Sequence, residues 1–166
     1  MGYNEPRTFD EVDFERVDAG FGYSAIVARV TATAPEEYAL FVAGKKTTRV
    51  RFLGVGVNSN QVQLWEIYLS PTLSANGTPV PIINRNGKFN PVSSFPLNAP
   101  KSVLYNTPTI VDPGQLVNRL FISGERTEGV GLTFKLSPNA KILARRVAGV
   151  GATVDSFVRL DWSEGR

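Results

Sequence analysis

The stretch TVDSFVRLDWS, residues 153–163, has the clearest alternation of apolar and polar residues in the chain. Val158, Leu160 and Trp162 are two residues apart, and charged residues stand between them. Because successive side chains of a β-strand point to opposite faces, this period predicts a strand with one face in a core. Phe157 interrupts the polar face, so we expect that face to be partly covered.

Outward from this stretch, the chain consists of short apolar runs separated by Gly, Pro and Asn. Prolines crowd the middle third of the chain and make a helix there unfavourable. Only 34–42 and 138–147 could hold a helical turn. The predicted strands are 23–33, 38–43, 47–57, 61–69, 80–83, 101–106, 119–124, 130–136, 140–149 and 153–163.

Two of the predicted strands depart from simple alternation. In 47–57, Val50 and Leu53 are expected to face opposite ways, and Gly54 and Gly56 indicate a bulge or a close approach of another group. In QVQLWEIYL, residues 61–69, the apolar phase reverses after the glutamines. This reversal predicts either a bulge or a strand that is buried on both faces towards its end.

About ten short strands joined by Pro-rich connections predict an all-β protein, a jelly-roll-like β-sandwich or barrel. The dipeptides Asn76-Gly77 and Asn86-Gly87 suit turn positions with positive φ. The longest irregular segment lies between Ile83 and Lys101, and it favours a Greek-key path in which the chain crosses between sheets. We expect a single domain over residues 21–166, preceded by an N-terminal arm over residues 1–20.

The predicted arm differs from the rest of the chain in charge. Residues 1–18 hold six acidic and two basic residues, a balance of −4, whereas the remainder has nine acidic and sixteen basic residues, a balance of +7. An acidic arm on a basic body indicates a tail that docks on a positive surface, its own or that of a neighbour. A disordered, solubilising terminus is the alternative.

The composition restricts the chemistry open to this chain. Its 166 residues include no Cys and no His, which excludes thiolate zinc sites, disulfides, Ser-His-Asp triads and imidazole acid–base steps. Carboxylate pairs for glycoside hydrolysis could be drawn from Glu66, Asp112, Glu125 or Asp155, as from many β-proteins. We therefore expect a protein that is not an enzyme and has no cofactor or metal. No apolar run is long enough to span a bilayer, and the acidic N-terminus is unlike a secretory signal.

Two binding functions remain open from the residue types alone. A nucleic-acid surface could use spread basic residues with aromatic stacking platforms, but the bases are thinly distributed and no nucleic-acid partner is expected. The basic candidates are Arg49, Arg51, Arg85, Lys88, Arg145 and Arg146. A carbohydrate-binding or tail-associated receptor-binding module could stack sugar rings on aromatic side chains. The aromatic candidates are Trp65, Tyr68, Phe89 and Tyr105, and burial in the core is the alternative for the tryptophans.

Two segments resemble small structural proteins of tailed-bacteriophage virions, of the head decoration or cement type. In the first segment a "V-x-L-x-E" phrase leads through "P-T-x-S-x-x-G-T" into "N-R-N". Its matching residues are Val62, Leu64, Glu66, Pro71, Thr72, Ser74, Gly77, Thr78, Asn84, Arg85 and Asn86. The second segment resembles the closing strand pair of that family. Its matching residues are Leu136, Pro138, Asn139, Leu143, Arg145, Leu160, Trp162 and Glu164.

The resemblance implies a non-enzymatic jelly-roll protein, often a trimer, on the surface of a phage head assembled in the host cytoplasm. There it would reinforce contacts between subunits of the major capsid protein. Within PIINRNGKFNP, residues 81–91, asparagine side chains would shape a loop and basic side chains would contact a neighbouring subunit or an acidic arm. The expected contact residues are Asn84, Arg85, Asn86, Lys88 and Phe89 in this loop, and Asp10, Glu11, Asp13 and Glu15 in the arm.

Overall fold

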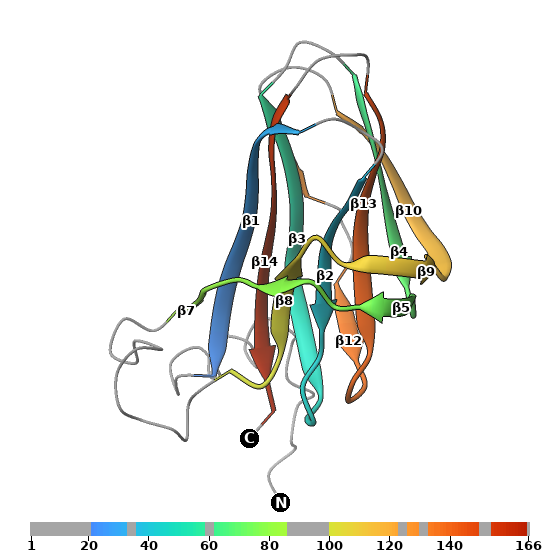
Figure 1. The fold of residues 1–166 in the computed structure, drawn as a ribbon. Helices are drawn as coiled ribbons and strands as arrows, with labels where there is room; N and C mark the ends of the chain where they lie inside the picture. Colours follow the sequence, from blue (N-terminus) through green and yellow to red (C-terminus); the bar gives the residue numbers. More distant parts are fainter. Residues whose placement is uncertain are drawn as a thin grey trace, which may run out of the picture.

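The computed structural model of the chain describes residues 21–32, 36–58, 62–85, 100–122, 126–129, 133–149 and 154–165 (Figure 1). Throughout these ranges the regular structure is β-strand, and the prediction of an all-β protein is confirmed. The described residues contain no helix long and apolar enough to cross a membrane. In particular, the segment 138–147, which could have held a helical turn, contributes most of a strand that begins at Lys141.

Within the described ranges the strands form two six-stranded sheets and one two-stranded ribbon, and all the pairings there are antiparallel. Sheet A has the order β11 (Arg126–Gly129), β3 (Thr48–Asn58), β14 (Val154–Glu164), β1 (Gly22–Ala32) and β7 (Ile82–Asn84), with β12 (Phe134–Leu136) also pairing with β3. Sheet B has the order β10 (Gln115–Ile122), β4 (Gln63–Leu69), β13 (Lys141–Gly149), β2 (Glu36–Val42), β8 (Val103–Asn106) and β6 (Thr78–Pro79). The ribbon joins β5 (Thr72–Ala75) to β9 (Thr109–Asp112).

The chain alternates between the two sheets of the sandwich. β1, β3 and β14 lie in sheet A, whereas β2, β4 and β13 lie in sheet B. In each sheet a strand from the C-terminal part of the sequence lies between two strands from the N-terminal part. β14 lies between β1 and β3, and β13 lies between β2 and β4. Strands from the two ends of the domain are therefore neighbours in both sheets.

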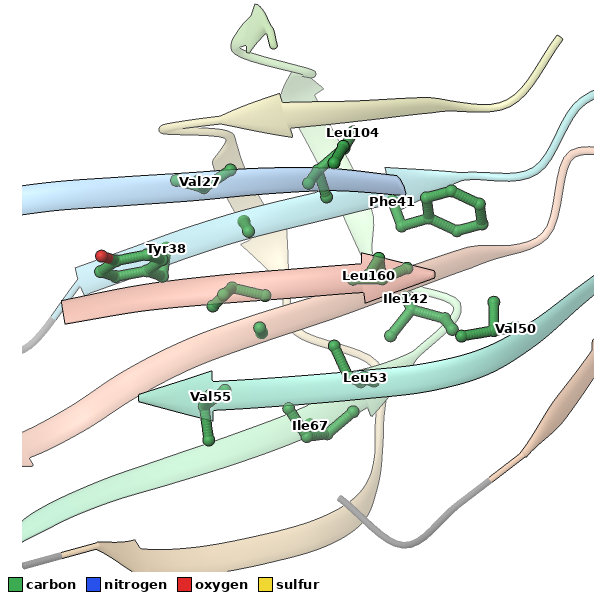
Figure 2. Packing of buried hydrophobic residues seen from close by; sticks show 14 of the residues in the cluster. Val27, Tyr38, Phe41, Val50, Leu53, Val55, Ile67, Leu104, Ile142 and Leu160 are labelled. Carbon is green, nitrogen blue, oxygen red and sulfur yellow. The ribbon is translucent and has the colours of Figure 1, made fainter. Parts of the chain in front are cut away.

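One hydrophobic cluster fills the space between sheets A and B (Figure 2). Phe41 of β2 packs edge-on against Trp162 of β14 across the two sheets, with ring centroids 5.1 Å apart. The Tyr38 hydroxyl donates a hydrogen bond to the backbone carbonyl of Ser156, which also joins the sheets. Trp65 stacks edge-on against Tyr38 at 4.8 Å, and neither tryptophan has exposed surface. Both tryptophans are therefore core residues and not platforms for a ligand.

Polar side chains lie inside the sandwich at the end where β4 begins. Gln63 and Arg146 are each 1% exposed, and Arg146 lies opposite Trp65 in the ladder between β13 and β4. Arg146 follows Ile142 and Ala144 at intervals of two, so its side chain points inward with theirs. The suggestion that Arg146 belongs to a basic surface is therefore wrong, because its strand position directs it into the core.

The ribbon of β5 and β9 crosses the outer face of sheet B. β8 and β10 lie at opposite sides of this sheet, and the eight residues between them must pass β2, β13 and β4. At about 3.3 Å per residue they span roughly 26 Å, enough for four strand spacings of about 4.8 Å. Leu40 and Leu143 point away from the core, yet both have no exposed surface, so we place the ribbon over them. Figure 1 shows the ribbon running across the strands of this sheet.

Residues with positive φ mark both bends of the ribbon. Where β4 and β10 bend into the ribbon, Ser70 has φ 57° and Gly114 has φ 84°. Where the ribbon bends again into β6 and β8, Gly77 has φ 92° and Thr107 has φ 51°. Such backbone conformations are unfavourable for Ser and Thr, especially for the β-branched Thr, so tertiary packing must hold them.

A glycine at each bend lets the two strands of the ribbon approach closely. A Cβ atom on Gly77 would lie 2.2 Å from the carbonyl oxygen of Asn106, and one on Gly114 would lie 2.3 Å from that of Leu69. No side chain fits at either distance, and the positive φ excludes most other residues as well. The predicted positive-φ turn at Asn76-Gly77 is thus confirmed at Gly77, whereas Asn86-Gly87 lies outside the described residues.

Candidate interaction surface

The outer face of sheet A carries exposed apolar side chains on its last two strands. Ile26 of β1 is 50% exposed and Ile83 of β7 is 65% exposed. Ile83 lies opposite Ser24, two residues from Ile26, so the two isoleucines are diagonal neighbours on one face. Exposed isoleucines beside charged groups are typical of a surface that contacts another protein.

A cleft beside these isoleucines is lined by three arginines and one aspartate. Its volume is about 370 Å³, and the lining residues Arg51, Arg85, Arg159 and Asp161 come from β3, from the end of β7 and from β14. We refer to it as the arginine cleft. The lining side chains together carry a charge of +2, and arginines present planar forks of donors that match carboxylates. The cleft is therefore suited to an acidic partner.

Asp161 orders one wall of the arginine cleft. The Arg159 guanidinium donates from Nε and Nη2 to the two oxygens of Asp161, at 3.1 and 3.0 Å. The Ser24 hydroxyl donates to Oδ1 of the same carboxylate at 2.7 Å. Asp161 is 9% exposed, whereas the Arg159 side chain is 47% exposed. The buried carboxylate thus holds an accessible guanidinium in place through a two-point contact.

A β-bulge brings Arg51 to this cleft. Phe52 pairs with Asp161 and Val50 pairs with Trp162, so Arg51 is an extra residue in β3. The bulge changes the phase of the strand, and Val50 and Leu53 both point into the core. The expectation that Val50 and Leu53 face opposite ways is wrong for this reason. Bulges re-aim side chains in this way at the edges of functional surfaces.

Gly54 and Gly56 of β3 lie outside the bulge, and Gly56 makes room for an aromatic ring. A Cβ atom on Gly56 would lie 2.3 Å from the ring of Phe157, its partner in β14, so the ring lies over the glycine backbone. The predicted close approach is confirmed at Gly56, and Phe157 is half-buried, as expected from its place on the polar face. This aromatic ring extends the apolar part of the outer face of sheet A.

Of the predicted contact residues, the structure describes Asn84 and Arg85. Asn84 is 5% exposed and pairs with Tyr23 of β1, so it belongs to the sheet and is not a free loop residue. Arg85 follows it, with its backbone N–H donating to the carbonyl of Gly22 at 2.8 Å, and its side chain lines the arginine cleft. The other expected contact residues, Asn86, Lys88, Phe89, Asp10, Glu11, Asp13 and Glu15, lie outside the described residues.

The residues that join Arg85 in the cleft were not predicted as a group. Arg159 and Asp161 stand on the polar face of the opening stretch 153–163, and this alternation was the available signal. Their proximity to Arg51 depends on the pairing of β14 with β3 and on the bulge. A pairing between segments a hundred residues apart leaves no local trace in the sequence.

A second carboxylate, Glu66, is buried on the outer face of sheet B. Its Oε1 accepts a hydrogen bond from Arg119 Nε at 2.7 Å, and its Oε2 accepts one from the Tyr68 hydroxyl. Burial alone would raise the pKa of Glu66, but these two hydrogen bonds and the charges of Arg119 and Arg145 outweigh it and lower the pKa. Burial and the bond to Glu66 raise the pKa of Tyr68.

This arrangement does not favour acid–base chemistry or sugar stacking at Glu66. The carboxylate is 4% exposed and Tyr68 is 9% exposed, so neither presents a surface to a substrate. Strand β4 is thus buried on both of its faces, one of the two outcomes expected for 61–69. Among the described residues, no group of three or more acidic side chains could hold a metal ion.

Comparison of the chain with models of protein families, with curated proteins and with solved structures finds no match.

Proposed function

We propose that this protein is a non-enzymatic structural component of a tailed-phage virion, a head decoration protein that binds the major capsid protein through the outer face of sheet A. The observation that carries the proposal is the combination of the arginine cleft with the exposed Ile26 and Ile83 on one sheet face. Such a mixture of arginine and apolar side chains suits a protein partner that supplies carboxylates.

The resemblance to decoration proteins supports the same proposal from the sequence. The two resembling segments occupy neighbouring strands, since β13 pairs with β4 and Arg145 lies opposite Glu66. Most matching residues that the structure describes have framework roles, such as Trp162 in the core and Gly77 at a bend. Arg85 is a matching residue that lines the arginine cleft, and it connects the resemblance to the proposed contact.

Binding to capsids tests the proposal. Capsids of the parent phage that lack the protein would be mixed with the purified chain, and bound protein would be measured by co-sedimentation. Replacing Arg85 with Ala should weaken binding about tenfold, or ~1.4 kcal/mol, because arginines at protein contacts often contribute this much. Circular dichroism and thermal unfolding should match those of the unaltered protein, since Arg85 is only half-buried.

A matched pair of apolar variants locates the contact on the molecule. Ile26→Ala removes an exposed side chain from the outer face of sheet A, and Val111→Ala removes one, 69% exposed, from the ribbon over sheet B. Only Ile26→Ala should weaken capsid binding. Equal effects would contradict the assignment of the contact to sheet A. A stable monomer that does not bind capsids would contradict the decoration function and the implied trimer together.

A further inference from the structure

A second cleft lies on the outer face of sheet B, beyond the ribbon, and three lysines line it. Its volume is about 520 Å³, and Lys45, Lys46 and Lys101 are exposed around it. The lining residues that the structure describes include no carboxylate. We call it the lysine cleft. It takes no part in the arginine cleft or in the function proposed above.

The floor of the lysine cleft is apolar. Val42 of β2 and Val103 of β8 are cross-strand partners, and Tyr105, which lies opposite Leu40, is the next outward residue along β8. They continue the row of outward side chains that the ribbon covers farther along the sheet. An apolar floor with a cationic rim is suited to a peptide in which acidic and apolar residues are mixed.

The walls of the lysine cleft are held by specific contacts. The buried Glu164 carboxylate accepts hydrogen bonds from the backbone N–H groups of Lys101, at 3.0 and 3.1 Å, and of Ser102, at 2.7 Å. The Ser102 hydroxyl in turn accepts from the N–H of Gly44 at 3.0 Å. A Cβ atom on Gly44 would lie 2.6 Å from the Cβ of Lys101, so the two lysine-bearing turns are in direct contact. The cleft is therefore a built feature of the fold.

We propose that the lysine cleft binds the acidic N-terminal segment of the same chain, residues 9–15. This segment, FDEVDFE, places Asp10, Glu11, Asp13 and Glu15 among Phe9, Val12 and Phe14. Its carboxylates match the lysine rim and its apolar side chains match the floor.

The first described residue, Phe21, lies near the lysine cleft, and this position favours binding of the arm of the same molecule. The carbonyl of Phe21 accepts a hydrogen bond from the N–H of Glu164 at 3.0 Å, and Glu164 is the residue that holds Lys101. The N–H of Gly165 donates to the carbonyl of Thr47, next to Lys46. Glu15 precedes Phe21 by six residues, which can span roughly 20 Å at about 3.3–3.6 Å per residue. A tethered segment this close has a high effective concentration at the cleft.

Zero-length cross-linking of the full-length chain with a carbodiimide tests the proposal directly. An equimolar mixture of ¹⁴N- and ¹⁵N-labelled protein would be cross-linked and digested, and the joined peptides would be identified by mass spectrometry. The expected products join acidic residues of 9–15 to Lys45, Lys46 or Lys101, with both peptides carrying the same label. Mixed labels would show that the arm docks on a second copy and would overturn the proposal, as would the absence of such products.

Lysine acetylation rates provide a readout that is independent of cross-linking. In a variant with Asp10→Asn, Glu11→Gln, Asp13→Asn and Glu15→Gln, the three cleft lysines should react with an acetylating reagent about three- to tenfold faster. The expected reason is that the arm no longer shields them. The unaltered chain in 1 M salt should behave similarly, since salt screens the attraction. The exposed Lys135 on β12 is the control and should not change. Unchanged acetylation rates at the cleft lysines would overturn the proposal. A faster rate at Lys135 as well as at the cleft lysines would show that the variant is partly unfolded, and this result would also overturn the proposal. Capsid binding is not used in either test, so the two proposals fail separately.

Discussion

The outer face of sheet A and the outer face of sheet B differ in what lies over them. On sheet A, Ile26 and Ile83 are at least half exposed, and the arginine cleft opens beside them. On sheet B, Leu40 and Leu143 have no exposed surface, and even the charged Glu66 is buried. The inward faces of both sheets contribute alike to one core.

The difference follows from the path of the described residues 70–85 and 100–114. After β4 the chain leaves sheet B, crosses it as β5, adds short strands to both sheets, and crosses back as β9 before β10. The crossing buries the part of the outer face of sheet B that lies beneath the ribbon. It leaves the outer face of sheet A available, and we expect stability to depend on the part of sheet B beneath the ribbon and capsid binding to depend on the open face of sheet A.

The largest contrast is expected between Leu143→Ala and Ile26→Ala. Leu143→Ala should lower the free energy of unfolding by about 2–5 kcal/mol, since it leaves a cavity beneath the ribbon. Ile26→Ala should lower it by less than about 1 kcal/mol, since its side chain already contacts water. Urea denaturation of both variants measures the contrast. Equal losses would show that the two faces are equally buried.

The ribbon bends provide the next test. Gly77→Ala and Gly114→Ala should each lower the free energy of unfolding by about 2–3 kcal/mol, because a Cβ atom would collide with a carbonyl oxygen at a positive φ. Gly165→Ala is the matched control, since its nearest atom would lie 3.5 Å away. If Gly77→Ala were no more harmful than the control, the close crossing at this bend would be refuted.

The pH dependence of Glu66 tests the buried charge on the covered face. Its lowered pKa means that the ionised carboxylate stabilises the fold above pH about 4.5, the unfolded value, and that this stability is lost as pH falls through the lower folded value. Glu66→Gln should cost about 1–3 kcal/mol at pH 7 and less at pH 3, because the advantage of the ionised carboxylate declines once pH falls below the unfolded value. Unfolding curves at both pH values measure this, and an equal cost at pH 7 and pH 3 would argue against it.

The smallest effect is expected for Arg159→Ala on the open face. The Arg159–Asp161 pair is partly exposed, so its loss should change the free energy of unfolding by less than about 1 kcal/mol. Asp161 would keep its hydrogen bond from Ser24. Thermal unfolding and capsid binding should be measured together, and a loss of binding without a loss of stability is the expected result. A large loss of stability would make Arg159 part of the framework.

Strand positions could be predicted from the sequence where one face is buried and the other is polar. Residues 153–163, 140–149 and 47–57 correspond closely to β14, β13 and β3. The predicted 119–124 begins four residues after β10 does, and β5, β6, β9 and β11 were not predicted. These four strands have two to four residues each and are too short to show a period.

The candidate site was predictable only in part. Arg85 was selected from a local pattern of residues, and it lines the arginine cleft as part of a larger group. Arg51 was considered with Arg85 only as one of six basic candidates, and its place in the cleft could not be predicted, because the bulge that positions it appears only in the register between β3 and β14. The burial of Glu66 also depends on distant segments, since Arg119 approaches from β10, 53 residues along the chain.

The sequence by itself determined that this chain is an all-β protein with most of its strands in the predicted places. The physical reason is local, since alternation with a period of two, proline and Asn-Gly pairs act through neighbouring residues. The tertiary structure alone decided which outer face the ribbon crosses and which basic residues share a cleft. It also decided that Val50 and Leu53 point to the same side of their strand. Those features depend on strand order and register, which are set by contacts between distant parts of the chain.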